Sequence, residues 1–408
     1  MKHALPIAAL FTIFSGSAVA HADPPRLEVQ AVERTGSMPK GVSLSPDGLH
    51  AYVTNFGELN HKNVMVYDAK TLALTDTINV PGNVVESVLS PDGATLYVSN
   101  FRRGSVQFID LKTKTVTHEL HTGENPKVLA LSPDGKTLFA ANWSSNSVTQ
   151  IDTEKAEIVR KMNAGRQPRG MAITTNGTLY VANFWGESID IFPGTDKAGD
   201  PVRTRVKTCK VPRHLALSPD EKTLYVSCLT ASQLLAYDLS AVSPPVASAP
   251  ALEAAPDSLA AAATPVVFTA TTPPATAPAP TTPATPATVT TGGTPTIKVV
   301  HRAQIGRAPK SISVSPDGRY VYSADYGESR SVTVVDTTDF SSRVFPVPGM
   351  DRGSGVVVYP DGKHALVTGW YDSHLYLVGF QGTGGDPEEA AKKTRGWIHR
   401  AYTEDHGE

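Results

Sequence analysis

One short motif recurs seven times along this chain and constrains its fold more than any other feature. Each copy has a Ser-Pro-Asp-Gly-like turn, followed a few residues later by a Tyr-Val-Thr-Asn-like segment, as at 45–48 and 52–55. The copies follow one another at steps of 42 to 45 residues, apart from one step of 97 residues between the fifth and the sixth. A period in the low forties with several short strands per unit is typical of a β-propeller. The acidic or amide residues of the seven turns are Asp47, Asp92, Asp134, Asn176, Asp220, Asp317 and Asp361.

Each unit is expected to contain four short strands, which in the first unit fall at 41–44, 51–54, 63–67 and 75–80. The proline presets φ for the turn between the first two strands, while Asp and Gly supply a local hydrogen bond and a permissive backbone. These aspartates are therefore interpreted as turn formers rather than as catalytic groups.

The two ends of the repeat array complement each other. The seventh unit has a third strand at 374–378 and no clear fourth, whereas 26–32 is a strand with no preceding three. Pairing the two would close the ring and remove an exposed sheet edge. We therefore predict an all-β, seven-bladed β-propeller of four-stranded blades, closed by the N-terminal strand of the mature chain.

Residues 1–22 have the features of a secretory signal peptide. A cationic start at Lys2 precedes an apolar run at 4–14 and Ala-x-Ala sites at 18–20 and 20–22. The run is too short to span a bilayer, and no later one is long enough, so we expect no transmembrane segment. These features predict a periplasmic or secreted protein.

The long step is explained by residues 241–295, a Pro/Ala/Thr-rich tract whose composition predicts disorder. It falls between the third and fourth strands of the fifth blade. The expected propeller domain therefore comprises 23–240 and 296–380, and 381–408 form a C-terminal tail, either loose or with a short helix.

The repeated SPDG…YVTN…VxVxD pattern resembles the YVTN-repeat family of seven-bladed propellers, which includes surface-layer-like proteins and proteins similar to the YncE group. The resemblance covers nearly the whole mature chain except the tract and the tail. It implies the fold and leaves the activity open, because relatives include binding proteins as well as lactonase-like and lyase-like enzymes.

The residue five positions before the motif serine is cationic in five units. Since first strands line the central channel of a propeller, these side chains are expected to ring its mouth. Such a cluster in a chain of net charge −2 repels itself unless water or an anion relieves it. The second unit interrupts the ring with Glu86. The cations are Lys40, Lys127, Arg169, Arg213 and Lys310, with Val85 and Ser354 at this position in units 2 and 7 and Arg352 two residues before Ser354.

The residue after the motif asparagine is aromatic in six units and is Leu229 in the fifth. Aromatic faces interleaved with Lys and Arg suit planar or anionic ligands and single-stranded nucleic acid. The alternative is structural: aromatics wedged between blades, and cations paired with neighbouring acids. The six aromatics are Phe56, Phe101, Trp143, Phe184, Tyr326 and Trp370.

The two cysteines, Cys209 and Cys228, fall on the same face of the fifth blade as the cations and aromatics. An exported protein meets an oxidising compartment, so we expect a disulfide between them.

For function, the sequence favours a non-enzymatic, monomeric propeller without a cofactor or metal. Its expected partner is an anionic small molecule, a nucleic-acid strand or an envelope protein bound at the channel mouth. The alternative is a lactonase- or lyase-type enzyme with its site at the same mouth. Glu86 and His214, each four residues before a motif serine, are then the acid–base candidates.

Overall fold

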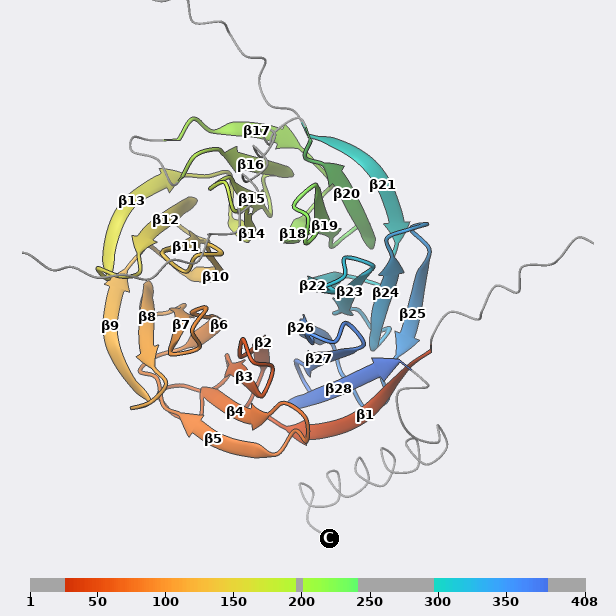
Figure 1. Ribbon diagram of the computed structural model, residues 1–408, viewed down its shortest axis with the longest axis horizontal. Helices are drawn as coiled ribbons and strands as arrows, with labels where there is room; N and C mark the ends of the chain where they lie inside the picture. The colour runs from red at the N-terminus through yellow and green to blue at the C-terminus, as the bar shows by residue number, and fades with distance from the viewer. Residues whose placement is uncertain (1–25, 196–200, 241–296, 381–408) are drawn as a thin grey trace, which may run out of the picture.

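The computed structural model describes residues 26–195, 201–240 and 297–380, which form a ring of seven sheets around a central axis (Figure 1). Each sheet has four antiparallel strands, so the predicted seven-bladed propeller is confirmed. The predicted signal peptide, the Pro/Ala/Thr-rich tract and the C-terminal tail lie outside the described residues.

In blades 1 to 6 the strands follow the chain from the centre of the ring to its rim, and in blade 7 the outermost strand comes from the start of the described chain. Blade 1 consists of β2 (Pro39–Leu44), β3 (His50–Asn55), β4 (Val64–Asp68) and β5 (Leu74–Ile78). Blade 2 consists of β6 (Val84–Leu89), β7 (Thr95–Asn100), β8 (Ser105–Asp110) and β9 (Thr115–His121). Blade 3 consists of β10 (Pro126–Leu131), β11 (Thr137–Asn142), β12 (Ser147–Asp152) and β13 (Glu157–Asn163). Blade 4 consists of β14 (Pro168–Ile173), β15 (Leu179–Asn183), β16 (Ser188–Phe192) and β17 (Thr204–Lys207).

The remaining blades keep this order. Blade 5 consists of β18 (Pro212–Leu217), β19 (Thr223–Cys228), β20 (Gln233–Asp238) and β21 (Lys298–Gln304), so residues 239–297 connect its third and fourth strands. Blade 6 consists of β22 (Pro309–Val314), β23 (Tyr320–Asp325), β24 (Ser331–Asp336) and β25 (Ser342–Pro346). Blade 7 consists of β26 (Gly353–Val358), β27 (His364–Gly369), β28 (His374–Phe380) and β1 (Leu27–Arg34).

Blade 7 closes the ring as predicted. Its outermost strand is β1, which pairs antiparallel with β28, for example Val32 opposite Tyr376. The first strand of the described chain therefore covers the edge that the last strand would otherwise expose.

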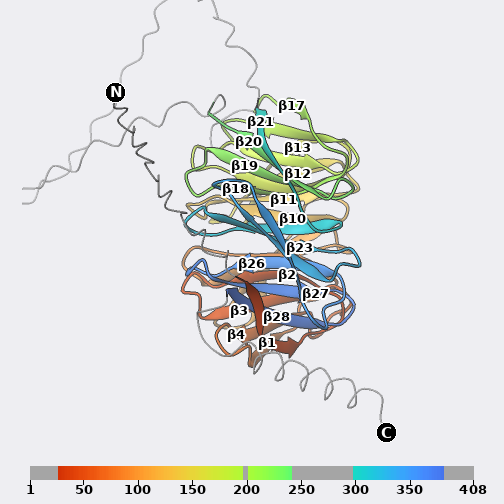
Figure 2. The ribbon, with the colours of Figure 1, turned by 90° about the vertical axis from the view of Figure 1, so that its right-hand side faces the viewer.

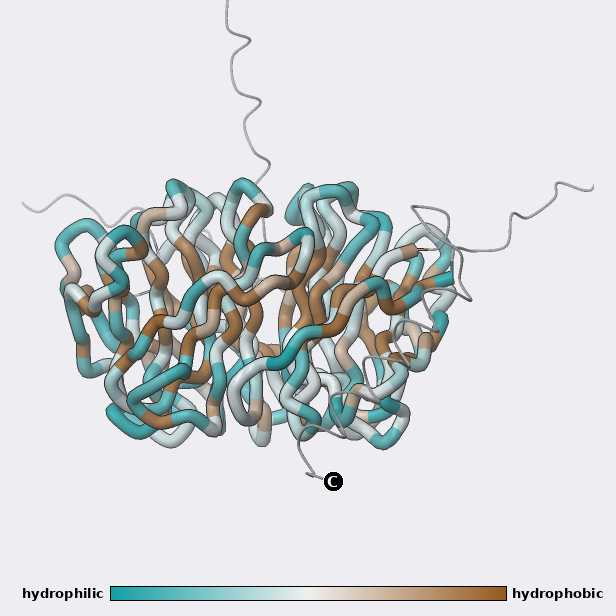
Figure 3. Tube along the Cα trace, turned by 90° about the horizontal axis from the view of Figure 1, so that it is seen from below, coloured by the Kyte–Doolittle hydropathy of each residue, from teal (hydrophilic) through white to brown (hydrophobic). Residues whose placement is uncertain are grey.

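The blades pack face to face, and the core lies between them. Figure 2 shows the ring edge-on as a disc, and Figure 3 shows apolar residues concentrated in the strands between two more hydrophilic loop faces. The largest fully buried side chains include Tyr67, Tyr180, Tyr322 and Tyr376. Among the described residues, no helix is long and apolar enough to cross a membrane.

The two faces of the disc differ in their loops. We call one the turn face; it carries the Ser-Pro-Asp-Gly turns. In blade 1 the Asp47 carboxylate accepts the backbone N–H of Leu49 at 2.9 Å, and the Ser45 hydroxyl accepts that of His50 at 2.9 Å. Gly48 has a φ of +70°, a conformation that favours glycine. The aspartates therefore act as turn formers.

Two departures from the motif meet on the turn face. Glu221 replaces the turn glycine of blade 5 and still adopts a φ of +56°. Its carboxylate accepts the backbone N–H of Thr175 at 2.9 Å and the Thr175 hydroxyl at 2.9 Å. Thr175 replaces the turn proline of blade 4, and this exchange provides the N–H that a proline lacks. The bonds between blades offset the backbone strain at Glu221.

Candidate functional site

The opposite face, which we call the mouth face, surrounds the end of the channel where the inner strands begin. Five of the seven inner strands begin with proline followed by a cation, as in Pro39-Lys40 of β2. We call the five cations and six aromatics predicted at this end the mouth ring: Lys40, Lys127, Arg169, Arg213 and Lys310 with Phe56, Phe101, Trp143, Phe184, Tyr326 and Trp370.

A repeated backbone bond fixes each aromatic position of the mouth ring. The N–H of Phe56 donates to the carbonyl of Met38 at 3.0 Å, and that of Trp143 donates to the carbonyl of Asn125 at 3.1 Å. Met38 and Asn125 have φ values of +52° and +54° and lie directly before the inner strands. Each of these aromatics is thus tied to the residue two positions before the cation position of its own blade.

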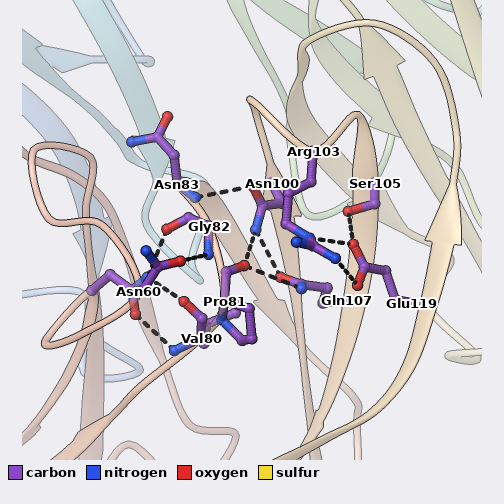
Figure 4. Close-up of polar contacts among 11 residues, drawn as sticks. Asn60, Val80, Pro81, Gly82, Asn83, Asn100, Arg103, Ser105, Gln107 and Glu119 are labelled. Atoms are coloured by element: carbon purple, nitrogen blue, oxygen red, sulfur yellow. Dashed lines mark hydrogen bonds and ion pairs between the residues drawn. The ribbon is translucent and has the colours of Figure 1, made fainter.

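The motif asparagine supports this link, as blade 2 shows (Figure 4). The side chain of Asn100 donates to the carbonyl of Pro81 at 2.6 Å and to Gln107 at 2.9 Å, and it accepts the N–H of Asn83 at 3.0 Å. The N–H of the next residue, Phe101, donates to the Asn83 carbonyl at 2.8 Å. The asparagine is therefore a scaffold residue that places the aromatic side chain.

Cations and aromatics alternate around the mouth ring. The Lys127 Nζ atom lies 3.6 Å from the ring centroid of Trp143 and 5.4 Å from that of Phe101. The Lys310 Nζ atom lies 4.0 Å from the centroid of Trp370 and 4.3 Å from that of Tyr326. These are cation–π distances, so the aromatic rings provide part of the stabilisation that water gives an exposed cation.

The aromatics also contact one another across blades. Phe56 lies 5.7 Å from Phe101 and 5.8 Å from Trp370, and Trp143 lies 5.0 Å from Phe184, between ring centroids. The aromatic rings therefore pack between neighbouring blades, as the structural interpretation of these residues expects. Blade 5 has Leu229 at this position, so the aromatic layer is interrupted beside Arg213.

The cations of the mouth ring are buried or half-buried and form no close ion pair with an acid among the described residues. Lys40, Arg169, Arg213 and Lys310 are only 7%, 9%, 9% and 7% exposed. None of the five cations forms an ion pair with a carboxylate in the part of the chain that the structure describes, and the buried Nε atom of Arg213 has no hydrogen-bond partner there. Burying an uncompensated charge costs several kcal/mol, more than the ~0.5–2 kcal/mol of a cation–π contact. The pairing expected in the structural alternative is therefore absent among these residues.

Burial and mutual repulsion act on the ring lysines in the same direction. Burial, together with the charges of Arg169, Lys40 and Arg213, lowers the pKa of Lys127 to about 5. Burial also holds the pKa values of Lys40 and Lys310 well below their ordinary value, and nearby guanidinium groups add to the effect. Arginine remains protonated at neutral pH even where burial lowers the pKa of Arg169 to about 10.

Glu86 is the acid that faces these cations. Its carboxylate lies over the neighbouring inner strand, because a Cβ atom at Gly41 would come within 2.6 Å of its Oε2 atom. Burial raises the pKa of Glu86, while the charge of Lys40, followed by those of Arg169, Lys310 and Arg213, opposes this shift. Gly41 therefore gives Glu86 the space to lie beside Lys40. The carboxyl group of Glu86 interacts electrostatically with several cations but forms no close ion pair with any of them among the described residues.

His214 also occupies an inner strand but forms no pair with Glu86. Its Nδ1 atom is buried without a hydrogen-bond partner among the described residues, and burial lowers its pKa to about 4. The two acid–base candidates share no hydrogen bond in the described structure. No group of three or more His, Cys, Asp or Glu in the described ranges is arranged to hold a metal ion.

Three further residues extend the mouth ring. Arg352 lies in the loop before β26, and its guanidinium is 5.4 Å from the ring centroids of both Tyr326 and Tyr371. Tyr371 and Trp185, 55% and 52% exposed, follow the predicted aromatics of blades 7 and 4 and were missed from the sequence. An aromatic pair at that position, as in Phe184-Trp185, is the signal that could have identified them.

A disulfide joins Cys209, in the loop before β18, to Cys228 at the end of β19, with Cα atoms 6.0 Å apart. Cys228 is fully buried and takes the place of the motif asparagine in blade 5. The bond therefore ties the loop before Arg213 to the second strand, a link that the side chains of Asn100 and Asn142 make in blades 2 and 3.

An open depression of about 730 Å³ lies beside Phe101 of the mouth ring, between blades 2 and 3. Phe101 belongs to both the mouth ring and the lining of the depression. Arg103, held by Glu119 at 2.7 and 2.9 Å, also lines it (Figure 4), as do Arg102 and Lys161. The depression is open to solvent and is lined by the acid Glu124 as well as by these cations.

Comparisons with known proteins support the fold. Residues 85–243 match the family model described as the YNCE-like beta-propeller. A comparison with curated proteins found no significant match. A solved structure titled Kuenenia stuttgartiensis hydrazine synthase has a similar fold, with a TM-score of 0.59, 18% sequence identity, and coverage of 88% of this chain and 97% of that chain. The chain is thus a seven-bladed propeller, and the resemblance to the YncE-like β-propellers is confirmed over residues 85–243.

Proposed function

We propose that this protein is a non-enzymatic propeller that binds a small anionic ligand with a planar or apolar body at the mouth ring. The observation that carries the proposal is the set of buried cations, Lys40, Arg169, Arg213 and Lys310, that have no ion-pair partner among the described residues. An anion would compensate their charge and complete their hydrogen bonds.

The sector of blades 4 and 5 is the expected position of the anionic group. The guanidinium groups of Arg169 and Arg213 lie 5.5 Å and 5.9 Å from the ring centroid of Phe184. The aromatic layer is open beside Arg213, where Leu229 stands. Two guanidinium groups can bind a carboxylate or phosphate with directed hydrogen bonds, while the adjoining aromatic faces contact the ligand body.

The protein is proposed to act in the periplasm or outside the cell. The Ala-x-Ala sites that follow the apolar N-terminal run support export, and the Cys209–Cys228 disulfide is consistent with an oxidising compartment. Cell fractionation, with N-terminal sequencing of the recovered protein, tests this; a protein that retains Met1 in the cytoplasm would refute it.

Binding is tested with 2-naphthoate, a planar carboxylate, followed by tryptophan fluorescence because Trp143 and Trp370 belong to the mouth ring. The variant Arg169→Met/Arg213→Met should weaken binding at least about tenfold, since charged hydrogen bonds contribute roughly 1.5–3 kcal/mol each. Binding to the natural chain should also weaken as salt is raised.

The matched control is Arg302→Met, which removes an exposed arginine from β21 on the rim of blade 5. It should leave binding unchanged. Equal affinity in the double variant and the control would refute the proposal. Binding of an oligothymidylate without binding of 2-naphthoate would instead identify a nucleic-acid site and refute the small-anion assignment.

A further inference from the structure

We propose that the mouth ring binds a ligand with two separate anionic groups, one on each side of the Leu229 position in blade 5. The proposal rests on the anion site proposed above and adds the number and the places of the negative charges that the ligand carries. It follows from the way in which cations, aromatic rings and the acid Glu86 are distributed around the mouth face.

The cation of blade 1 has an acid close to it. The Lys40 Nζ atom lies 5.3 Å from the ring centroid of Phe56, and the carboxylate of Glu86 lies over Gly41, the next residue of the same inner strand. Burial raises the pKa of Glu86, and among the cations that oppose this shift Lys40 has the largest effect. The charge of Lys40 is therefore partly balanced within the protein.

Blades 3 to 5 carry a first run of cations, which we call the arginine arc: Lys127, Arg169 and Arg213. The first two share Trp143, whose ring centroid lies 3.6 Å from the lysine Nζ atom and 5.3 Å from the guanidinium. The two arginines share Phe184, at 5.5 and 5.9 Å, and this ring contacts the exposed side chain of Trp185 at 5.1 Å. None of the three cations forms an ion pair with a carboxylate among the described residues.

Blades 6 and 7 carry a second run, which we call the tyrosine arc: Lys310 and Arg352 with Tyr326 and Tyr371. The two cations share Tyr326, whose ring centroid lies 4.3 Å from the lysine Nζ atom and 5.4 Å from the guanidinium. The exposed ring of Tyr371 lies 5.4 Å from the same guanidinium. Neither cation forms an ion pair with a carboxylate in the described ranges. The tyrosine arc thus repeats a pattern of the arginine arc, in which two cations share one ring and an exposed aromatic lies beside them.

Leu229 separates the two arcs. Its N–H donates to the carbonyl of Val211 at 3.1 Å, the same backbone bond that places the aromatics of other blades, but its side chain is aliphatic and half-buried. Burial lowers the pKa of Lys310, and among the neighbouring charges Arg213 adds most to this shift, so the ends of the two arcs are close. One small ligand can therefore reach both arcs with an apolar body over Leu229.

The charge distribution favours a ligand with an anionic group at each arc. A single carboxylate accepts directed hydrogen bonds from the donors at one place. It would therefore leave the cations of the other arc buried or half-buried without a close ion pair, which is costly. Two anionic groups on one body balance both arcs, so the ligand class is a small dicarboxylate or a similar dianion with separated charges.

The test compares ligands that share a body and differ in the number of charges. Calorimetry gives the dissociation constants of 2-naphthoate and of 1,4-, 2,3- and 2,6-naphthalenedicarboxylate, which hold their two carboxylates at different spacings. The tightest of the three should bind at least about tenfold more tightly than 2-naphthoate, well beyond the roughly twofold gain that two equivalent carboxylates give by statistics. We call this ratio of dissociation constants the dianion preference.

The diagnostic variant is Lys310→Met/Arg352→Met, which removes both cations of the tyrosine arc. It should lower the dianion preference to about twofold, because the second carboxylate loses its partners. Arg352→Met alone changes a half-buried position in a loop and should lower the preference in the same direction if the double variant does not fold. Lys363→Met removes an exposed lysine from the turn face of blade 7 and is the matched control, which should keep the preference of the natural chain.

The outcomes separate the two proposals. A dianion preference of about twofold or less in the natural chain, or a preference that persists in the variants of the tyrosine arc, would overturn the present inference and leave the anion site standing. Tighter binding of 2-naphthyl phosphate, which carries both charges on one group, than of every dicarboxylate would also overturn it. Failure of all these anions to bind the natural chain would overturn both proposals.

Discussion

The two faces of the disc carry repeated charged residues for different physical reasons. On the turn face, a serine hydroxyl donates to the aspartate of its own turn and lowers its pKa, as for Asp47, Asp92, Asp134, Asp220 and Asp317. On the mouth face, Arg169 and Arg213 are buried without a close ion pair among the described residues, and burial lowers their pKa values although Glu86 opposes the shift.

The contrast shows how to interpret a repeat. A charge that is satisfied within its own turn is part of the scaffold, because each blade needs the same local bonds. A charge that recurs in buried positions without a close ion pair lowers stability, so its repetition indicates a requirement outside the fold. The predictions below test this difference, from the largest expected effect to the smallest.

The largest effect concerns Asp325, the acid that takes the place of the motif asparagine in blade 6. Its carboxylate accepts hydrogen bonds from the hydroxyl groups of Ser323, Ser331 and Thr333, which lower its pKa, but burial is the stronger influence and raises the pKa to about 7. Because the folded pKa exceeds the unfolded one, the contribution of Asp325 to stability is complete below about pH 4 and declines as pH rises to 7. The loss is about 4 kcal/mol.

Chemical denaturation at several pH values checks this prediction. In Asp325→Asn the pH-dependent loss between pH 4 and 7 should disappear, because an amide has no proton to lose. Asparagine stands at this position in blades 1 to 4, so the variant is compatible with the fold. Identical pH profiles for the two proteins would show that Asp325 is ionised throughout.

The disulfide on the mouth face should have the next largest effect. Replacing Cys209 and Cys228 with alanine should lower the free energy of unfolding by about 3 kcal/mol, since the bond closes a short loop in the unfolded chain. Thermal denaturation with and without a reducing agent provides the measurement. A variant as stable as the oxidised natural protein would show that the fold of blade 5 does not depend on this bond.

The mouth-ring cations should be costly for stability. Arg213→Met removes a buried charge that forms no close ion pair among the described residues, so the free energy of unfolding should rise by about 1–2 kcal/mol even though anion binding weakens. Arg302→Met, in the same blade but exposed, should change neither quantity. Denaturant midpoints of the three proteins test this; a destabilised Arg213→Met would show that the ring supports the fold.

On the turn face, removing a repeated charge should lower the free energy of unfolding instead of raising it, and this is the smallest effect of the four. In Asp92→Ala the N–H of Ala94 and the hydroxyl of Ser90 lose their acceptor, so the free energy of unfolding should fall by about 1 kcal/mol. Asp92→Asn keeps an acceptor oxygen, so it should retain most of the free energy of unfolding that Asp92→Ala loses. Anion affinity should be unchanged in both, and a loss of affinity would contradict the separation of the two faces.

Much of this molecule could be predicted from the sequence because its order is local and repeated. The spacing of the turns defines the blades, and strand alternation within each unit fixes which residues reach the channel. The register therefore predicted that Lys40 and Lys127 occupy equivalent places, and that Phe56 and Trp143 do too. It also predicted the closing strand, because an unpaired edge was left at each end of the array.

Only the tertiary structure decided how deeply the charged side chains are buried and which groups lie close enough to balance their charges. Whether Arg213 meets an acid depends on distances between blades, which a repeat register does not contain. Gly41 admits Glu86, and Thr175 supplies the bonds that hold Glu221, through contacts between different blades. Periodicity determines which side chains face the same space. Their burial and pairing depend on the packing of all seven blades around one axis.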